Sequence, residues 1–364
     1  MRKLTRRDFI RTLAAGAGAI ALSPMLTGCQ AEETQRASDT VQSQFQPTET
    51  GVPQEAMEAT PTPTVSQVGE NQPGSGDVSS TPTEVVPQPV EPAQPSAGIP
   101  DLAVARGGEP EDLVRRAIAA LGGMERFVKK GYKVIIKPNI CTDYHTYEYA
   151  ATTNPWVVGA LVKLAFEAGA QTVQVMDNGF GGTPQSGYKK SGIKEQVEKA
   201  GGEMVVMPSF KYVRTQIPEG RDIKEWDFYE DILTADLVID VPIAKHHGST
   251  RLTLAMKNLM GVILDRGRLH ANLGQRIADI TSRVRPGLVV IDAVRILTAN
   301  GPTGGNLEDV KKLDTVIASA DIVAADSYAT GLFGLKPDDI RYIVAGAEMG
   351  LGRKDVENLI ISEV

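Results

Sequence analysis

Short apolar runs alternate with amphipathic segments from about residue 109 to the C-terminus, and this alternation limits the fold more than any other feature. Short apolar runs are typical of buried strands, and apolar residues three or four positions apart are typical of helices. Strands separated by helices form parallel sheets, because each helix carries the chain back to the starting edge. We therefore predict an α/β domain with a mostly parallel sheet and helices on both faces.

The pattern divides residues 101–364 into seven predicted strands and seven predicted helices. The strands cover residues 133–137, 172–176, 204–207, 236–241, 288–291, 315–318 and 359–362. The helices cover residues 109–121, 154–168, 187–200, 253–262, 273–283, 322–333 and 337–349. The second helix has the clearest signals, since Asn154 can cap it, Pro155 suits its first turn and Gly169 suits its end.

Residues 31–100 have a different composition. They contain a single aromatic residue, Phe45, and 11 of the chain's 22 prolines. Such a segment buries too little apolar area to offset the entropy lost on ordering. We therefore predict a disordered linker over residues 29–100, followed by one α/β domain over residues 101–364 with a sizeable core.

Residues 1–28 have the features of a twin-arginine (Tat) lipoprotein signal peptide. The sequence Thr-Arg-Arg-Asp-Phe-Ile at residues 5–10 precedes an apolar stretch at residues 13–26, which is too short for a stable transmembrane helix. Leu-Thr-Gly-Cys at residues 26–29 matches a lipobox. We expect the Tat translocase as a partner during export, lipidation of Cys29 and an extracytoplasmic lipoprotein anchored in a membrane by its acyl chains.

The formal charge of −7 is spread unevenly: residues 1–28 carry +4 and residues 31–100 carry −9, which leaves −2 for the rest. The domain therefore lacks the basic excess that nucleic-acid binding requires. With Cys29 assigned to lipid, only Cys141 remains. One thiol excludes a disulfide framework and a self-contained iron–sulfur cluster.

Polar residues follow several predicted strands, where parallel sheets bind their ligands. Lys137 and Asn139 end the strand over 133–137, and either an anion clamp or a solvated strand end would explain them. Asp177 opens a glycine-rich segment that we interpret as a flexible active-site loop. Lys245 follows the strand over 236–241.

Three of the chain's four histidines, His246, His247 and His270, lie within 25 residues. His246 and His270 could serve as acid–base groups or metal ligands, with Cys141 as a third metal candidate or a nucleophile. Polar surface histidines and a buried apolar cysteine are the alternatives. The metal motifs His-x-x-x-His, Cys-x-x-Cys and His-Glu-x-x-His are absent from the sequence.

The predicted helix over 253–262 would place Thr253 and Lys257 on one face, since they are four residues apart. Lys257 and Asn258 interrupt an otherwise apolar face, where a cation requires a carboxylate, a phosphate or a cofactor. Asp326 lies in an alanine-rich segment where an acid also needs a partner, and Lys257 or Lys137 could provide it.

Taken together, these motifs resemble the family called domain of unknown function 362. The residues that carry the resemblance are Lys137-Pro138-Asn139, Pro155, Glu167–Ala170, Lys245-His246, Thr253, Lys257–Gly261, His270, Gly301-Pro302, Gly304 and Ala320–Asp326. Many members of that family look like iron–sulfur proteins, but this chain lacks the cysteines. The family is also similar in architecture to nickel-pincer lactate racemases, which would imply hydroxy-acid chemistry with Lys and His at a cofactor; the motifs of this chain do not carry that assignment.

The leading hypothesis is an extracytoplasmic enzyme, assisted by a cofactor or metal, that acts on a small anionic substrate. Its predicted catalytic residues are His246, His270 and Lys257, and its predicted ligand-binding residues are Lys137, Asn139, Lys245, Thr253, Asn258, Asp177 and Asp326. The alternatives are a non-catalytic lipoprotein that binds an anionic ligand or a redox partner, and an accessory factor for assembly of an exported metalloenzyme. All require these lysines and histidines to converge on one cleft.

Overall fold

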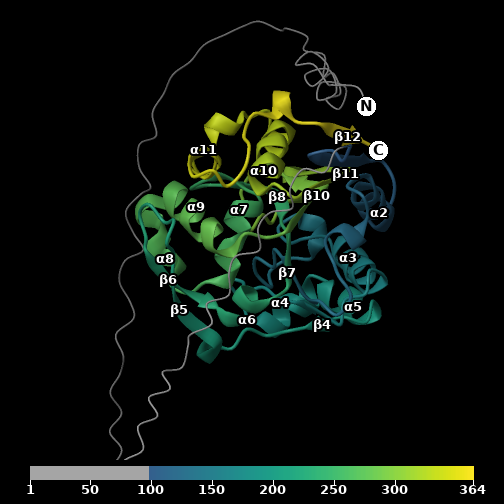
Figure 1. The fold of residues 1–364 in the computed structure, drawn as a ribbon, viewed down its shortest axis with the longest axis horizontal. Helices are drawn as coiled ribbons and strands as arrows, with labels where there is room; N and C mark the ends of the chain where they lie inside the picture. Colours follow the sequence, from purple (N-terminus) through teal and green to yellow (C-terminus); the bar gives the residue numbers. More distant parts are fainter. Residues whose placement is uncertain (1–97) are drawn as a thin grey trace, which may run out of the picture. The chain divides into compact units, whose positions relative to one another are not determined.

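The structure is a computed structural model that describes residues 98–364 (Figure 1). The predicted signal peptide, Cys29 and nearly all of the predicted linker lie outside the described residues. Within residues 98–364, no helix is long and apolar enough to cross a membrane.

A ten-stranded sheet forms the centre of the domain. Its order is β12-β1-β11-β10-β7-β2-β3-β4, and β8 pairs with β10 and β9 beside this path. The strands are β1 (Leu102–Arg106), β2 (Lys133–Pro138), β3 (Thr172–Val175), β4 (Glu203–Met204), β7 (Leu237–Val241), β8 (Ile243–His247), β9 (Arg251–Thr253), β10 (Leu288–Leu297), β11 (Val310–Ser319) and β12 (Ile361–Glu363). Six of its nine strand pairings are parallel, which confirms the predicted mostly parallel α/β sheet.

Helices cover both faces of this sheet (Figure 1). Along β2, Val134 and Ile136 face one apolar core with α2 (Pro110–Ala120), α3 (Pro155–Glu167) and α5 (Ile193–Lys199). Ile135 faces the other core, since successive side chains of a strand point to opposite faces. The helices of this second core are α7 (Ala255–Asn258), α9 (Leu273–Val284), α10 (Ile322–Thr330) and α11 (Arg341–Glu348).

A separate antiparallel pair, β5 (Tyr212–Gln216) and β6 (Glu225–Tyr229), packs beside the second core. The sequence pattern did not predict these two strands or β1, each of which has only five residues. Two further short helices, α6 (Glu230–Thr234) and α8 (Arg266–Leu269), were also missed.

The predicted helix over 187–200 is two helices, α4 (Pro184–Lys190) and α5. Gly192 separates them with a φ of 77°, a left-handed conformation that a helix interior does not contain. The predicted helix over 154–168 agrees with α3, and the side chain of Asn154 accepts a hydrogen bond from the backbone of Trp156 as its cap.

The predicted helix over 253–262 is wrong in its first part. After β7 the chain passes Pro242 and continues as β8 along β10, then turns back as β9. Thr253 pairs with Lys245 in this hairpin instead of starting a helix. Only α7 and a 3₁₀ turn over Leu259–Val262 are helical, because strand pairing determines the conformation of residues 251–253.

Candidate functional site

A cavity of about 410 Å³ lies where β2 and β3 end, beside β8, β9 and α7. This is the edge at which α/β sheets bind ligands. Nine predicted site residues line the cavity: Lys137, Asn139, Cys141, Asp177, Lys245, Thr253, Lys257, Asn258 and His270. His246 and Asp326 are not among the residues that line it. The loops over 177–183 and 300–306 also reach the cavity, through Asp177–Phe180 and Pro302.

Lys137 is fully enclosed by partners. Its side chain is 1% exposed, and Nζ lies 2.9 Å from Asp177 Oδ1 in a buried ion pair. Nζ also donates to Asn258 Oδ1 at 2.8 Å and to the carbonyl of Pro138 at 3.0 Å. Asp177 in turn accepts from the backbone N–H of Ile140 at 2.6 Å. The charge of Lys137 is therefore already balanced by the protein.

Asp240 lies behind this pair, next to Lys137 in the register of β2 and β7. Asn258 Nδ2 donates to Asp240 Oδ1 at 2.7 Å, while Oδ2 has no hydrogen-bond partner. Complete burial raises the pKa of Asp240 well above its usual range, and the charge of Lys137 opposes this rise. Asn258 thus connects Lys137 to a buried carboxyl group that sequence analysis did not single out.

Lys245 is the second buried lysine of the cavity, with 1% exposure. Its Nζ donates to neutral oxygens only: Asn139 Oδ1 at 2.9 Å and the carbonyls of Ala151 at 2.6 Å and Pro302 at 3.0 Å. Burial lowers its pKa. Cys141 Sγ also donates to the Pro302 carbonyl, at 3.4 Å, which places the thiol beside this lysine.

Lys257 is the cavity lysine whose amine has neither an anionic partner nor a hydrogen bond to oxygen among the described residues. No carboxylate within residues 98–364 forms an ion pair with it, and its Nζ has only a 3.6 Å contact with the sulfur of Met260. Burial, together with the nearby charges of Lys245, Arg266 and Lys137, lowers the pKa of Lys257 to about 7. Near neutral pH this amine therefore exists in both charged and neutral forms.

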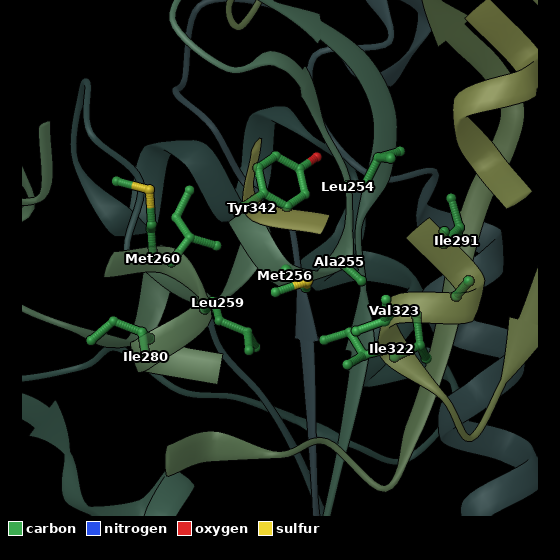
Figure 2. Packing of buried hydrophobic residues seen from close by; sticks show 14 of the residues in the cluster. Leu254, Ala255, Met256, Leu259, Met260, Ile280, Ile291, Ile322, Val323 and Tyr342 are labelled. Atoms are coloured by element: carbon green, nitrogen blue, oxygen red, sulfur yellow. The ribbon is translucent and has the colours of Figure 1, made fainter. Parts of the chain in front are cut away.

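The apolar residues beside Lys257 belong to the second core. Met256 of α7 and Leu259 of the 3₁₀ turn that follows lie in one buried cluster with Ile322 and Val323 of α10 (Figure 2). Asp326 holds the start of α7, since its carboxylate accepts from the backbone N–H groups of Ala255 at 2.7 Å and Met256 at 2.9 Å.

Asp326 was expected to pair with Lys257 or Lys137, and that expectation is wrong. The carboxylate has backbone partners, and Asp177 pairs with Lys137. Burial raises the pKa of Asp326 to about 7.

Because side chains alternate between the two faces of β8, His247 lines the cavity and His246 does not. Lys245 and His247 are two residues apart on the strand and both line the cavity. His246 points elsewhere, and its Nδ1 accepts from the backbone N–H of Gly301 at 3.1 Å. Burial, followed by the charges of Lys257 and Lys245, lowers the pKa of His247 to about 3, so its ring is neutral near pH 7. A strand prediction for residues 243–247 would have identified His247.

Arg266, Thr253 and His270 complete the polar lining. Arg266 donates to the carbonyl of Asn178 and forms no ion pair with a described carboxylate. Thr253 is 3% exposed, and its hydroxyl has no hydrogen-bond partner within the described chain. His270 is exposed at the rim, with Nδ1 3.2 Å from the Gly267 carbonyl. These groups are free to contact a ligand.

The backbone at Gly261 passes close to the Lys137–Asp177 ion pair and forms one wall of the cavity. At Gly261, a Cβ atom would overlap Asp177 Oδ1 and lie 2.6 Å from Lys137 Nζ. The carbonyl of Gly261 accepts from Asn178 N–H at 3.3 Å, which joins this wall to the loop after β3. Gly261 is therefore required for the chain to pass the Lys137–Asp177 pair.

The metal candidates do not form a metal site. Among residues 98–364, no group of three or more His, Cys, Asp or Glu side chains is placed to hold a metal ion. Cys141 and His270 line the cavity while His246 points away from it. The lining instead contains four cationic side chains, Lys137, Lys245, Lys257 and Arg266, and one carboxylate, Asp177. Fold and lining together define an α/β protein with a cationic ligand cavity.

Comparison with known proteins assigns the family. Residues 134–331, more than half of the chain, match the domain of unknown function DUF362, and the chain belongs to this family. The thylakoid-associated protein sll1697 of Synechocystis sp. is 26% identical over 253 residues, which cover 65% of this chain and 74% of that protein.

Two solved structures are similar to parts of the fold. The lactate racemase apoprotein from Thermoanaerobacterium thermosaccharolyticum is 15% identical with a TM-score of 0.35, and the match covers 58% of this chain and 53% of that one. A Thermotoga maritima protein is 14% identical with a TM-score of 0.40, over 62% of this chain and 60% of that one. The chain thus spans between half and two thirds of each of these structures.

Proposed function

We propose that this protein is an extracytoplasmic, cofactor-assisted enzyme that binds a small anionic substrate in the cavity beside β8 and α7. One observation carries the proposal: the lining has four cations and a single carboxylate, and that carboxylate is already neutralised by Lys137. The excess positive charge of Lys245, Lys257 and Arg266 needs an anion, because unpaired cations in a partly desolvated site are costly.

Proton transfer is the chemistry that the lining supports best. The pKa of Lys257 is lowered to about 7, close to the value at which a group donates and accepts protons efficiently near neutral pH. His247 is neutral beside it and offers a hydrogen-bonding ring. Substrate-binding cations next to a proton-exchanging amine favour an enzyme over a simple anion-binding protein.

The cavity residues fit an anionic organic cofactor better than a metal held by side chains. The buried hydroxyl of Thr253 lacks a partner, and Lys257 lacks an anion. Both would be satisfied by a carboxylate or phosphate group. Arg266 and Thr253 would hold that group in the positive field of Lys245, and the group would supply reactivity that the side chains lack.

Export and membrane attachment form the second part of the proposal. They rest on the arginine pair at residues 6–7, the apolar stretch that follows and the lipobox that ends in Cys29. We expect Cys29→Ser to lose incorporation of an alkynyl fatty acid, and Arg6→Lys with Arg7→Lys to keep the protein in the cytoplasm. Labelling or export that persists in these variants contradicts this part.

Binding of sulfate measures the cation excess directly. We expect isothermal titration of the full chain to show one sulfate site and Arg266→Ala to weaken it about tenfold, the loss typical of one charge-assisted hydrogen bond. Arg268→Ala is the matched control, since Arg268 is two residues away, exposed, and stacked on Trp226 outside the cavity. Equal affinities for both variants contradict the proposed site.

A second experiment tests the enzyme against simple binding. The exported protein is purified, its absorption spectrum and metal content are measured, and the small molecules released by denaturation are analysed by mass spectrometry. An anionic organic group near one per chain supports a cofactor-assisted enzyme. A protein that binds sulfate but releases no such group supports the non-catalytic alternative.

A further inference from the structure

We propose that Lys257 is a nucleophilic amine that forms an imine with the carbonyl carbon of a small 2-oxo acid. The inference rests on the proposed function, because it uses the same cavity, and it deepens it by naming the substrate class and the reacting atom. It depends on the different surroundings of the cavity's lysines.

The first argument is the freedom of the Lys257 side chain. Lys137 donates to three oxygens and Lys245 to three others, so neither amine can leave its partners without breaking buried hydrogen bonds. Lys257 makes only a weak contact with Met260, at 3.6 Å. Its Nζ can therefore approach an atom in the cavity at little cost.

The second argument is the availability of the neutral amine, since only the neutral form attacks a carbonyl group. The titratable groups that interact with Lys257 are Lys245 and His247 on β8, Arg266 on α8, Lys137 on β2 and Cys141 after β2. The His247 ring is neutral, and the three cations together with burial favour loss of a proton from Nζ. The pKa of Lys257 is about 7, so a large fraction of the amine is neutral under physiological conditions.

The third argument is the neighbouring charge. Lys245 and Arg266 line the same cavity and lack carboxylate partners among the described residues. The carboxylate of a substrate beside Arg266, in the positive field of Lys245, would be the anionic group that the cavity requires, and it would leave the adjacent carbonyl carbon within reach of α7. A 2-oxo acid has the carboxylate and the carbonyl group on neighbouring carbons, which suits two cations beside an amine.

The reaction balances without an added oxidant or reductant. The Nζ lone pair attacks the carbonyl carbon, the C–N bond forms, and one Nζ proton moves to the former carbonyl oxygen. That oxygen then leaves as water with the second Nζ proton. Amine and ketone thus give an imine and water, with no net change in protons or electrons.

Reductive trapping tests the inference. The full chain is incubated with pyruvate and sodium cyanoborohydride, and the product is analysed by intact mass and peptide mapping. We expect one reduced pyruvate adduct per chain, at Lys257, with a rate that rises as the pH passes about 7. Acetone, which has a methyl group in place of the carboxylate, should react at least about tenfold more slowly, because it lacks the anchoring charge.

Two variants separate the amine from the other lysines. Lys257→Arg keeps a cation but cannot form an imine, and it should lose the adduct while sulfate still binds. Lys189→Arg changes an exposed lysine of α4 and should keep the adduct. Circular dichroism establishes that both variants are folded.

The outcomes distinguish this inference from the proposed function. Sulfate binding without an adduct at Lys257 overturns the imine and leaves the anion site in place. Adducts spread over several lysines, or equal rates for pyruvate and acetone, also overturn it. Absence of sulfate binding and of an adduct overturns both.

Discussion

Lys137 and Lys257 line the same cavity, yet their surroundings are opposite. Lys137 is 1% exposed and has a carboxylate at 2.9 Å, an amide oxygen and a carbonyl as partners. Lys257 is partly buried, and a methionine sulfur at 3.6 Å is its nearest polar partner. The first lysine stabilises the end of β2, whereas the second leaves a charge for a ligand to satisfy.

This difference shows that a buried lysine is not by itself a functional residue. A lysine whose counter-ion lies within the protein stabilises the fold, and removing it leaves a buried carboxylate without a partner, which is destabilising. A buried lysine without a counter-ion can bind a ligand, and removing it also removes the unfavourable free energy of burying an unpaired charge. The following predictions test this contrast, from the largest expected effect to the smallest.

Lys137→Met should lower the free energy of unfolding by about 3–5 kcal/mol, because it leaves Asp177 and Asp240 in the interior without a cation. Urea denaturation followed by circular dichroism measures the change. Lys257→Met is the matched control and should leave stability unchanged or raised. Similar losses in the two variants would remove the contrast between the lysines.

Gly261→Ala should cost about 1–3 kcal/mol of stability, since the added methyl group overlaps Asp177 Oδ1 and forces the ion pair or the backbone to move. The same denaturation experiment applies. Gly267→Ala, in α8, has open space around its Cβ position and should stay within about 0.5 kcal/mol of the parent. If Gly261→Ala leaves the free energy of unfolding unchanged, the cavity wall at Gly261 is not tightly packed.

Sulfate affinity should fall as the pH rises through about 7, by up to about tenfold, because Lys257 loses its proton there while sulfate keeps its charge. Below this pH the ammonium form attracts the anion, and above it the neutral amine does not. Titration calorimetry across this range measures the effect. Lys257→Arg should flatten the profile, since arginine stays charged; an unchanged profile would assign the dependence to another group.

His247→Gln should weaken sulfate binding by about two- to fivefold, the effect of altering one neutral hydrogen-bonding group in the cavity. His246→Gln should leave the affinity unchanged, because that ring points away toward Gly301. The same titrations compare the two neighbours. A larger effect at His246 would contradict the orientation of β8.

Much of the fold could be predicted from local patterns. β2, β3, β7, α3 and α9 lie within a residue or two of their predicted positions, since each has clear apolar periodicity or capping residues. β8 and β9 could not be predicted, because β8 exists by pairing with β10, some fifty residues further along the chain, and β9 by pairing with β8. Strand pairing between residues far apart in the chain is not visible in the local sequence pattern, which covers only neighbouring residues.

Sequence analysis named most of the polar residues that line the cavity, but it missed His247 and Arg266 and included His246 and Asp326, which do not line it. Polar residues after apolar strands indicated Lys137, Asn139, Asp177 and Lys245, and all four line one cavity. The choice of His246 over its neighbour depended on the strand's orientation, which the sequence pattern did not contain. Asp240 lies within an apolar run of the sequence, so the pattern did not indicate it as a site residue. Its position next to Lys137 is visible only in the pairing of β2 with β7.

The amino-acid sequence alone determined the alternation of strands and helices, the identities of the charged residues and the excess of cations near the strand ends. These properties depend on neighbours a few positions away, so composition and periodicity contain them. The tertiary structure decided which lysine has a carboxylate and which has none, because Asp177 lies 40 residues from Lys137 in the chain and 2.9 Å from it in space. Electrostatic energy depends on that distance in space and on burial, and neither can be read from spacing along the chain.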